Sequence, residues 1–136
     1  ALERVSNEAP IDRGLLATAR GEYAEARACF DTAASAAHAA LEARAGAAAD
    51  AASALLVEEA VCAENNLAVC RLYTKELREA MRGLEAMIRR DPVLFLRQSV
   101  AQNLSGLYEF MTDAAQRRTV IREVVEAHQI EDLDPK

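Results

Sequence analysis

Residues 61 to 92, VCAENNLAVCRLYTKELREAMRGLEAMIRRDP, decide the fold of this chain. They read as two helices with a polar turn, Thr74 to Glu76, between them. The second helix places its apolar residues three or four apart, which is the spacing of one helical face: Leu77, Ala80, Leu84 and Met87. Asp91-Pro92 ends the pair, because proline cannot continue a helix and biases the residue before it away from helical backbone. The stretch therefore predicts a helical hairpin.

Two helices approach each other closely where their facing side chains are small. Ala68 and Ala80 supply such a contact, and Leu67 and Leu84 are large enough to fill the space beside it. This alternation of small and large residues over a helix, a turn and a second helix is the layout of a tetratricopeptide repeat.

An earlier stretch matches the same layout more fully. Its first helix begins near Pro10, and Gly21-Glu22-Tyr23 forms the turn. Six of its residues fall on signature positions of the repeat: Gly14, Gly21, Tyr23, Ala26, Phe30 and Ala33. This is the most specific signal in the chain.

Alanine-rich sequence separates these two repeats, which lie farther apart than the usual period of about 34 residues. Residues 33 to 60 contain long alanine runs, with Gly46 and Asp50 in the middle. Because alanine has the highest helix propensity, we expect the second helix of repeat 1 to extend to about Ala45 and the next helix to start early after a short break. Two long helices would then project beyond the rest of the stack.

A third repeat is expected after Asp91-Pro92. Its first helix carries Leu104 and Leu107, and Asp113 with Gln116 resembles an N-terminal cap and its reciprocal partner at the start of a second helix. Four residues of that second helix would form an apolar stripe that closes the end of the stack: Val120, Ile121, Val124 and Val125.

These patterns together predict an all-α fold, a right-handed tetratricopeptide-repeat solenoid of about three helix-turn-helix pairs with a long alanine-rich helical hairpin. A single domain spans residues 1–136. Its parts are repeat 1 at about 10–45, the alanine-rich extension at about 34–60, repeat 2 at about 61–92, repeat 3 at about 93–128 and an acidic tail at 129–136.

Composition and charge argue against several classes of partner. Nucleic acids and anionic membranes are bound by clustered Lys and Arg, whereas this chain has a net charge of -6, and Arg89-Arg90 and Arg117-Arg118 are only pairs, typical of solvated helix faces. No apolar run is long enough for a membrane span. The 3 cysteines are odd in number and fit a reducing compartment. Because the chain begins at Ala1, we expect a piece of a longer protein.

The sequence offers no pattern typical of a catalytic, metal or cofactor site. His38 and His128 have no partner at metal-ligand spacing and fit surface or helix-end positions, and Cys62 and Cys70 fit small core positions on a packed helix. We therefore expect a protein that is not an enzyme and binds neither a metal, a cofactor nor a small-molecule substrate.

The sharpest site hypothesis is a peptide groove, because the first helices of stacked helix pairs line a concave surface. Seven residues form the expected partner-binding set, with Leu72 beside them: Asn65, Asn66, Val69, Tyr73, Gln102, Asn103 and Phe110. Asn66 and Asn103 occupy the same repeat position, and an Asn amide can both donate to and accept from an extended peptide backbone. The alternative is that these amides bond a neighbouring helix or the local backbone.

Residues 64 to 110 also resemble a narrower family, the carboxyl-terminal repeat region of TRAPP complex subunit twelve. The stretches that carry the resemblance are Asn65-Asn66-Leu67-Ala68-Val69-Cys70, Leu72-Tyr73, Leu84-Glu85-Ala86-Met87-Ile88, Asp91-Pro92, Ser99-Val100, Asn103-Leu104 and Leu107-Tyr108-Glu109. The resemblance implies a non-catalytic subunit of a vesicle-tethering complex in ER-to-Golgi traffic and autophagy. It also implies TRAPP core subunits as protein partners and a cytoplasmic location, peripheral to ER-Golgi membranes. The alanine-rich insert departs from the family pattern.

Two other functions compete with this one. A chaperone-adaptor module would clamp a carboxylate-ended peptide with Lys or Arg on its first helices, but the corresponding positions here are Ile11, Leu15, Ser99 and Asn103. A self-associating architectural repeat is the other alternative.

Overall fold

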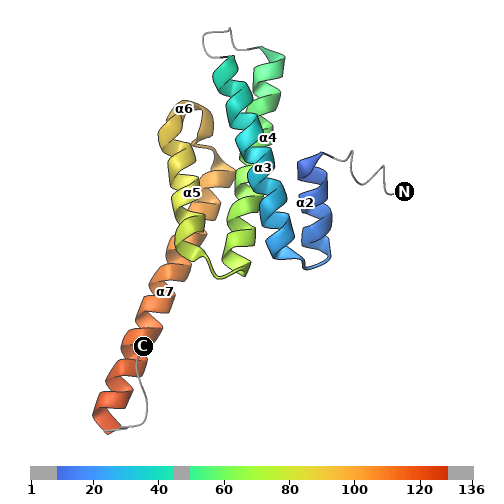
Figure 1. Ribbon diagram of the computed structural model, residues 1–136. Coiled ribbons are helices and arrows are strands. Elements are labelled where there is room, and N and C mark those ends of the chain that lie inside the picture. The colour runs from blue at the N-terminus through green and yellow to red at the C-terminus, as the bar shows by residue number, and fades with distance from the viewer. Residues whose placement is uncertain (1–8, 45–49, 129–136) are drawn as a thin grey trace.

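The computed structural model describes residues 9–44 and 50–128 of the chain (Figure 1). Within these residues every regular element is a helix, so the predicted all-α class is confirmed. The helices are α2 (Pro10–Ala19), α3 (Tyr23–Ala43), α4 (Ala51–Tyr73), α5 (Leu77–Arg90), α6 (Pro92–Phe95) and α7 (Gln98–His128). None of the described helices is long and apolar enough to span a membrane. The predicted acidic tail and the side chain of His128 lie outside the described residues.

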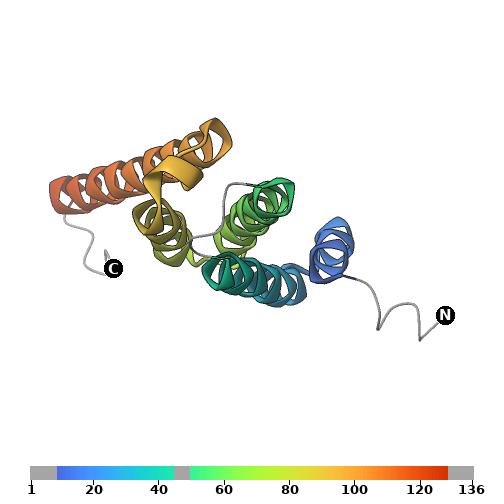
Figure 2. The same ribbon diagram turned by 90° about the horizontal axis from the view of Figure 1, so that it is seen from above.

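Each helix packs mainly against its neighbours in the chain. The contacts run from α2 to α3, from α3 to α4, from α4 to α5, and from α5 to α6 and α7. Seen from above in Figure 2, the chain runs from α2 at one end, through α3 and α4 opposite each other in the middle, to α5 and α7 at the other end, so the described helices form a row of pairs and not a closed bundle.

The two helix pairs, α2–α3 and α4–α5, turn in the same way. After α2, the Gly21 amide donates to the Thr18 carbonyl at 3.0 Å and the Glu22 amide donates to the Ala17 carbonyl at 2.9 Å. Gly21 has φ 76°, as this type of helix end requires. After α4, Lys75 takes the same role with φ 64°, and the amides of Lys75 and Glu76 donate to the corresponding carbonyls of the preceding turn.

Small residues let the helices of each pair approach closely. Gly14 of α2 lies directly against the ring of Phe30 of α3, where an added Cβ would come within 2.7 Å of the ring. Ala68 of α4 and Ala80 of α5 are both buried. The sequence pattern of small and large residues therefore corresponds to real close packing.

The alanine-rich sequence forms the two long helices that it predicts. α3 continues to Ala43, and α4 begins at Ala51 after the cap residue Asp50. The carboxylate of Asp50 accepts a hydrogen bond from the Ser53 amide at 2.8 Å. Such a cap satisfies one of the free amides at the start of a helix.

The core lies along α3 and α4. The larger core cluster surrounds Leu84 and draws buried residues from α3, α4, α5, α6 and α7. A second cluster, here named the smaller core cluster, contains Phe30 with Ala17, Ala26, Leu67 and Cys70, and a third consists of three alanines of α3 and α4. The apolar side chains of α3, α4 and α5 thus connect the two helix pairs.

The prediction of a third helix-turn-helix pair was wrong. α7 runs for 31 residues without a turn at Asp113, and Val120, Ile121 and Val124 are exposed instead of closing the stack. The physical reason is local: Asp113 is followed by strong helix formers and by neither glycine nor proline, so a single cap-like residue does not end the helix. Asp91-Pro92 instead starts the short helix α6, with Asp91 accepting from the Leu94 amide at 3.2 Å.

Candidate interaction surface and pocket

The residues predicted to line a peptide groove lie on α4 and α7. Both helices run in the same direction in Figure 1, and the Asn65 amide of α4 donates to the Ser99 hydroxyl of α7 at 3.2 Å. The oxygen of that amide, Asn65 Oδ1, is buried and has no hydrogen-bond partner among the described residues. Asn65 thus joins two helices. This agrees with the alternative that these amides bond a neighbouring helix and not a peptide.

The remaining amides of the predicted set differ in their surroundings. The Asn66 amide donates to the Cys62 carbonyl one turn earlier at 2.8 Å, so it bonds its own helix. Asn103 is half-buried on α7, and Gln102 beside it is exposed. Gln102 is therefore the amide that is most accessible to a partner.

Three apolar members of the set are open to solvent. Val69 is 37% exposed, Tyr73 60% and Phe110 57%. Tyr73 stacks on Tyr23 of α3, with ring centroids 4.4 Å apart and ring planes 9° from parallel. Leu72, which the sequence places beside them, packs against the larger core cluster instead. The face thus presents separate apolar side chains from α4 and α7.

His38 does not lie at the surface, as the sequence suggested, but is buried. Its Nε2 atom lies 3.6 Å from a carboxylate oxygen of Glu64 on α4. Its ring meets that of Phe95 of α6 edge to face, with centroids 5.4 Å apart. His38 therefore connects α3 to both α4 and α6. The contact with α6 exists because Asp91-Pro92 begins the helix that carries Phe95.

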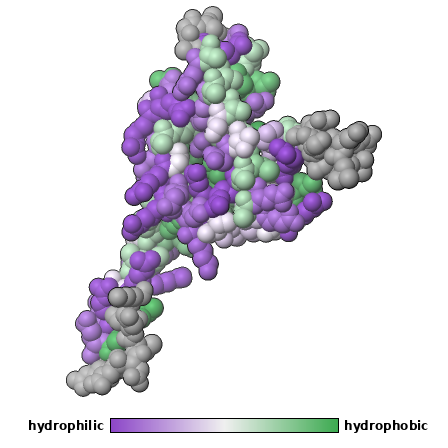
Figure 3. Space-filling view, in the orientation of Figure 1, coloured by the Kyte–Doolittle hydropathy of each residue, from purple (hydrophilic) through white to green (hydrophobic). Residues whose placement is uncertain are grey.

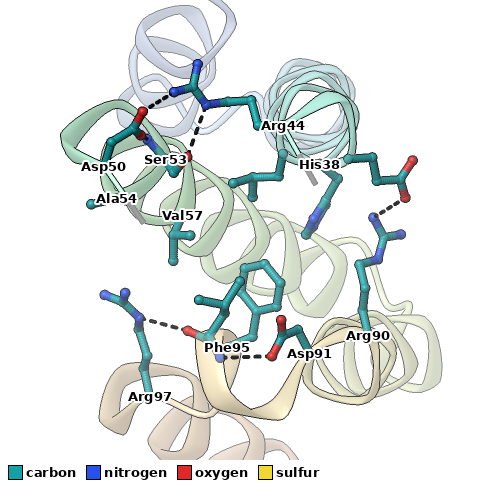
Figure 4. A pocket seen from close by; sticks show the side chains of 13 residues that line it. His38, Arg44, Asp50, Ser53, Ala54, Val57, Arg90, Asp91, Phe95 and Arg97 are labelled. Atoms are coloured by element: carbon teal, nitrogen blue, oxygen red, sulfur yellow. Dashed lines mark hydrogen bonds and ion pairs between the residues drawn. The ribbon is translucent and has the colours of Figure 1, made fainter. Parts of the chain in front are cut away.

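A pocket of about 730 Å³ opens above His38, between α3, α4 and α6 (Figure 4). Its apolar lining comes from Leu41, Ala54, Val57, Leu94 and Phe95. The sequence did not predict this pocket, because one of its lining residues, Phe95, belongs to α6. Only that short helix places the Phe95 ring against His38 of α3. The helix-start signal of Asp91-Pro92 was the one feature that could have pointed to it.

The three arginines at the mouth of this pocket all have acidic neighbours. Arg44 lies 2.5 Å from Asp50 and also donates to the Ser53 hydroxyl at 3.0 Å. Arg90 lies 3.7 Å from Glu42, and Arg97 pairs with Glu58. Because each guanidinium faces a carboxylate, the mouth offers no unmatched positive charge to an anion.

The Asp50 carboxylate is the titratable group at this mouth with the clearest perturbation. Hydrogen bonds from Ser53 hold the pKa of Asp50 below its ordinary value, and Arg44 lowers it further. The carboxylate therefore acts as a charged cap for α4, which suits a structural role.

The three cysteines differ in their exposure. Cys70 is buried, and this burial raises the pKa of its thiol. Cys62 is exposed, so the expectation that both residues fill core positions was right for Cys70 and wrong for Cys62. Among the residues that the structure describes, no three His, Cys, Asp or Glu side chains gather in a metal-binding group.

Part of the chain is similar to a human and a mouse protein of one name, trafficking protein particle complex subunit 12. The identity to the protein of Homo sapiens is 41% over 64 residues, which is 46% of this chain, and to that of Mus musculus 41% over 56 residues, or 41% of the chain. The matches cover only 9% and 7% of these relatives. No protein-family model and no solved structure matches the chain. The similarity thus joins this chain to a short segment of a trafficking-complex subunit.

Proposed function

We propose that this chain is a non-catalytic scaffold segment that binds other proteins in membrane trafficking, within or beside a TRAPP vesicle-tethering complex. The observation that carries the proposal is the 41% identity to part of trafficking protein particle complex subunit 12. A row of helices with accessible faces suits such a role, because stacked helix pairs offer extended surfaces for partners. The expected location is cytoplasmic and peripheral to ER-Golgi membranes, with a role in autophagy as part of the proposal.

The proposal includes a tetratricopeptide-like architecture for α2 to α5. Four pairs of equivalent residues recur at one offset along the chain: Gly14 with Ala68, Gly21 with Lys75, Ala26 with Ala80, and Phe30 with Leu84. The first pair supplies small contact residues, the second has positive φ, and the last two are fully buried. This recurrence supports an internal repeat with one inserted hairpin between its copies.

The α4–α7 face is the proposed binding surface. Val69 and Gln102 are exposed there, while Asn65 holds the two helices together. An extended peptide lying between the helices would meet apolar side chains and free amide groups, and TRAPP core subunits are the proposed partners.

A charge-addition experiment tests this surface. Val69→Glu with Gln102→Glu in the full-length tagged protein should reduce recovery of co-purifying TRAPP core subunits by about tenfold or more, because carboxylates would be placed in the contact. Thr32→Glu with Ser35→Glu adds the same charge to exposed positions of α3 and serves as the control. Equal recovery of TRAPP core subunits with both double variants, at equal helicity, would remove the α4–α7 face from the proposal.

A further inference from the structure

The pocket between α3, α4 and α6 has a buried imidazole in its lining. The side chain of His38 is only 8% exposed, and in Figure 4 its ring points from α3 toward Phe95 of α6. A carboxylate oxygen of Glu64 lies 3.6 Å from Nε2, which is too long for a hydrogen bond. Within the described part of the chain, no hydrogen bond reaches either nitrogen of the ring. The pocket therefore contains a buried polar group whose hydrogen-bonding capacity is unused.

The other polar side chains of this lining already have partners. Each of the three arginines at the mouth faces a carboxylate. The Ser53 hydroxyl accepts from Arg44, and the Asp91 carboxylate accepts from the Leu94 amide at the start of α6. These groups also balance one another in charge. His38 is thus the buried polar residue of the lining that a bound molecule could satisfy.

The size and the walls of the pocket suit a small organic molecule. Its volume of about 730 Å³ lies within the range of about 300–1,000 Å³ that is typical of ligand sites. Leu41 of α3, Val57 of α4 and Phe95 of α6 supply apolar walls from three different helices. Figure 3 shows mainly hydrophilic residues on the surface beside α5 and α6, so this apolar lining has polar surroundings. An apolar cavity with a few polar groups is the usual form of a small-molecule site.

We propose that this pocket, here named the His38 pocket, binds an uncharged small molecule that has an apolar body and a hydroxyl group. The body lies against Val57 and Phe95, and the hydroxyl forms a hydrogen bond with His38, since an imidazole can donate from one nitrogen and accept at the other. A carboxylate in place of the hydroxyl would lie near the carboxylate of Glu64, and the arginines at the mouth are already matched. The molecule is a ligand and not a substrate, and the proposal does not depend on the trafficking role.

A molecule in the His38 pocket contacts α3, α4 and α6 at once. It therefore adds to the edge-to-face contact between the rings of His38 and Phe95, which already connects α3 to α6. A ligand that binds the folded chain and not the unfolded chain raises the stability of the fold. The melting temperature of the chain should accordingly rise with the concentration of such a ligand.

Three naphthalene compounds test the chemistry of the ligand. 2-Naphthol is uncharged at neutral pH and carries one hydroxyl, 2-methylnaphthalene has nearly the same shape without the hydroxyl, and 2-naphthoate carries a negative charge. In NMR titrations of the isotope-labelled chain, 2-naphthol should cause saturable shifts of the Val57 and Phe95 amides. It should bind about three- to tenfold more tightly than 2-methylnaphthalene, because it adds one hydrogen bond, and more tightly than 2-naphthoate. No saturable shift at these amides, or binding of 2-naphthoate as tight as that of 2-naphthol, overturns the proposal.

Ala54→Trp tests the place of binding. Ala54 lines the pocket but is exposed, so a tryptophan there should fill the mouth without overpacking the core. Ala52→Trp places the same side chain at an exposed position of α4 outside the lining and serves as the control. Ala54→Trp should weaken the binding of 2-naphthol by about tenfold or more, and Ala52→Trp should leave it unchanged. Equal affinity of the two variants for 2-naphthol, at equal helicity, overturns the assignment to the His38 pocket.

His38→Phe tests the hydrogen bond. The variant keeps an aromatic ring against Phe95 but has neither ring nitrogen. It should bind 2-naphthol and 2-methylnaphthalene about equally, because the hydroxyl loses its partner. A preference for 2-naphthol in the folded variant as large as that in the wild type would contradict the role of His38. If the variant does not fold, the comparison of the three compounds on the wild-type chain still decides the proposal.

Discussion

Gly14 shows how one residue allows a close helix contact. A Cβ at this position would come within 2.7 Å of the Phe30 ring, and Phe30 is fully buried, so the ring has no free space into which it could move. Glycine is therefore required at this contact because α2 and α3 approach too closely for a side chain. Gly106 of α7 is different, since nothing lies within 4 Å of an added Cβ there.

These two glycines give a matched prediction. Gly14→Ala should lower the free energy of unfolding by about 1–3 kcal/mol, because it overpacks the smaller core cluster. Gly106→Ala should raise it by about 0.5–1 kcal/mol, because alanine is the better helix former in open space. Urea unfolding followed by circular dichroism measures both changes. Two changes of the same sign would show that the Gly14–Phe30 contact is wrong.

Asp50 gives a pH-dependent prediction. Its pKa is lower in the folded chain than in the unfolded chain, so its stabilising effect is present above the unfolded value and is lost as pH falls through the folded value. Asp50→Ala should therefore lower the melting temperature by a few degrees at neutral pH, and this difference should shrink in acid.

Asp50→Asn is the control for this cap. The amide oxygen still accepts from the Ser53 amide but carries no charge, so the difference in melting temperature between Asp50→Asn and Asp50→Ala should not vary with pH. Thermal melts from about pH 7 to about pH 2 extend well below the ordinary pKa of an aspartate, about 3.9, and so cover the range in which the folded carboxylate takes up its proton. A difference between wild type and Asp50→Ala that is the same across this range would contradict the charged cap.

At the scale of elements, α7 is the main departure from the sequence pattern. Asp113 and Gln116 resemble a helix start, yet the helix passes through them because the residues directly after Asp113 favour helix and are neither glycine nor proline. Asp91-Pro92 shows the converse, since it ends α5 and also begins α6. A cap-like residue thus marks a possible boundary, and the residues beside it decide whether the helix ends there.

A distance measurement separates one long helix from a hairpin. Spin labels at Ser105 and Glu123, both exposed and on the same side of α7, should lie with their backbone atoms about 27 Å apart in a continuous helix. A turn at Asp113 would bring them much closer together. Pulsed electron resonance reads this distance directly, and a main population at short distance would contradict the continuous α7.

The sequence predicted the first two helix pairs and the long alanine-rich helices, because their signals are local spacing, turn residues and helix propensity. It did not predict the burial of His38, because that burial requires Glu64 and Phe95 to meet it from two other elements. For the candidate site it suggested Val69 and Phe110, which are exposed. The local hydrogen bond of Asn66 was left open as an alternative, because sequence alone does not show where an amide points.

At the scale of the whole molecule, apolar contacts run along the row of helices. The larger core cluster joins five of them and has Leu84, which is fully buried, at its centre. Leu67 belongs to the smaller core cluster, so α4 contributes to both. A row connected in this way should lose stability as a unit when either cluster is damaged.

Leu84→Ala should lower the free energy of unfolding by about 2–5 kcal/mol, because it removes buried side-chain atoms and leaves a cavity in the larger core cluster. Leu55, which is 61% exposed on α4, is the matched control, and Leu55→Ala should change stability by no more than about 0.5 kcal/mol. Chemical unfolding of both variants tests this difference. Equal losses of unfolding free energy in the two variants would contradict the burial of Leu84 in the core.

We propose that this chain belongs to a protein that works as a binding scaffold in membrane trafficking. Affinity purification of the full-length tagged protein from its own cells, followed by quantitative mass spectrometry, tests this role. A trafficking scaffold should recover TRAPP core subunits at stoichiometric level. Recovery of chaperones in their place, or of the tagged protein alone, would contradict it.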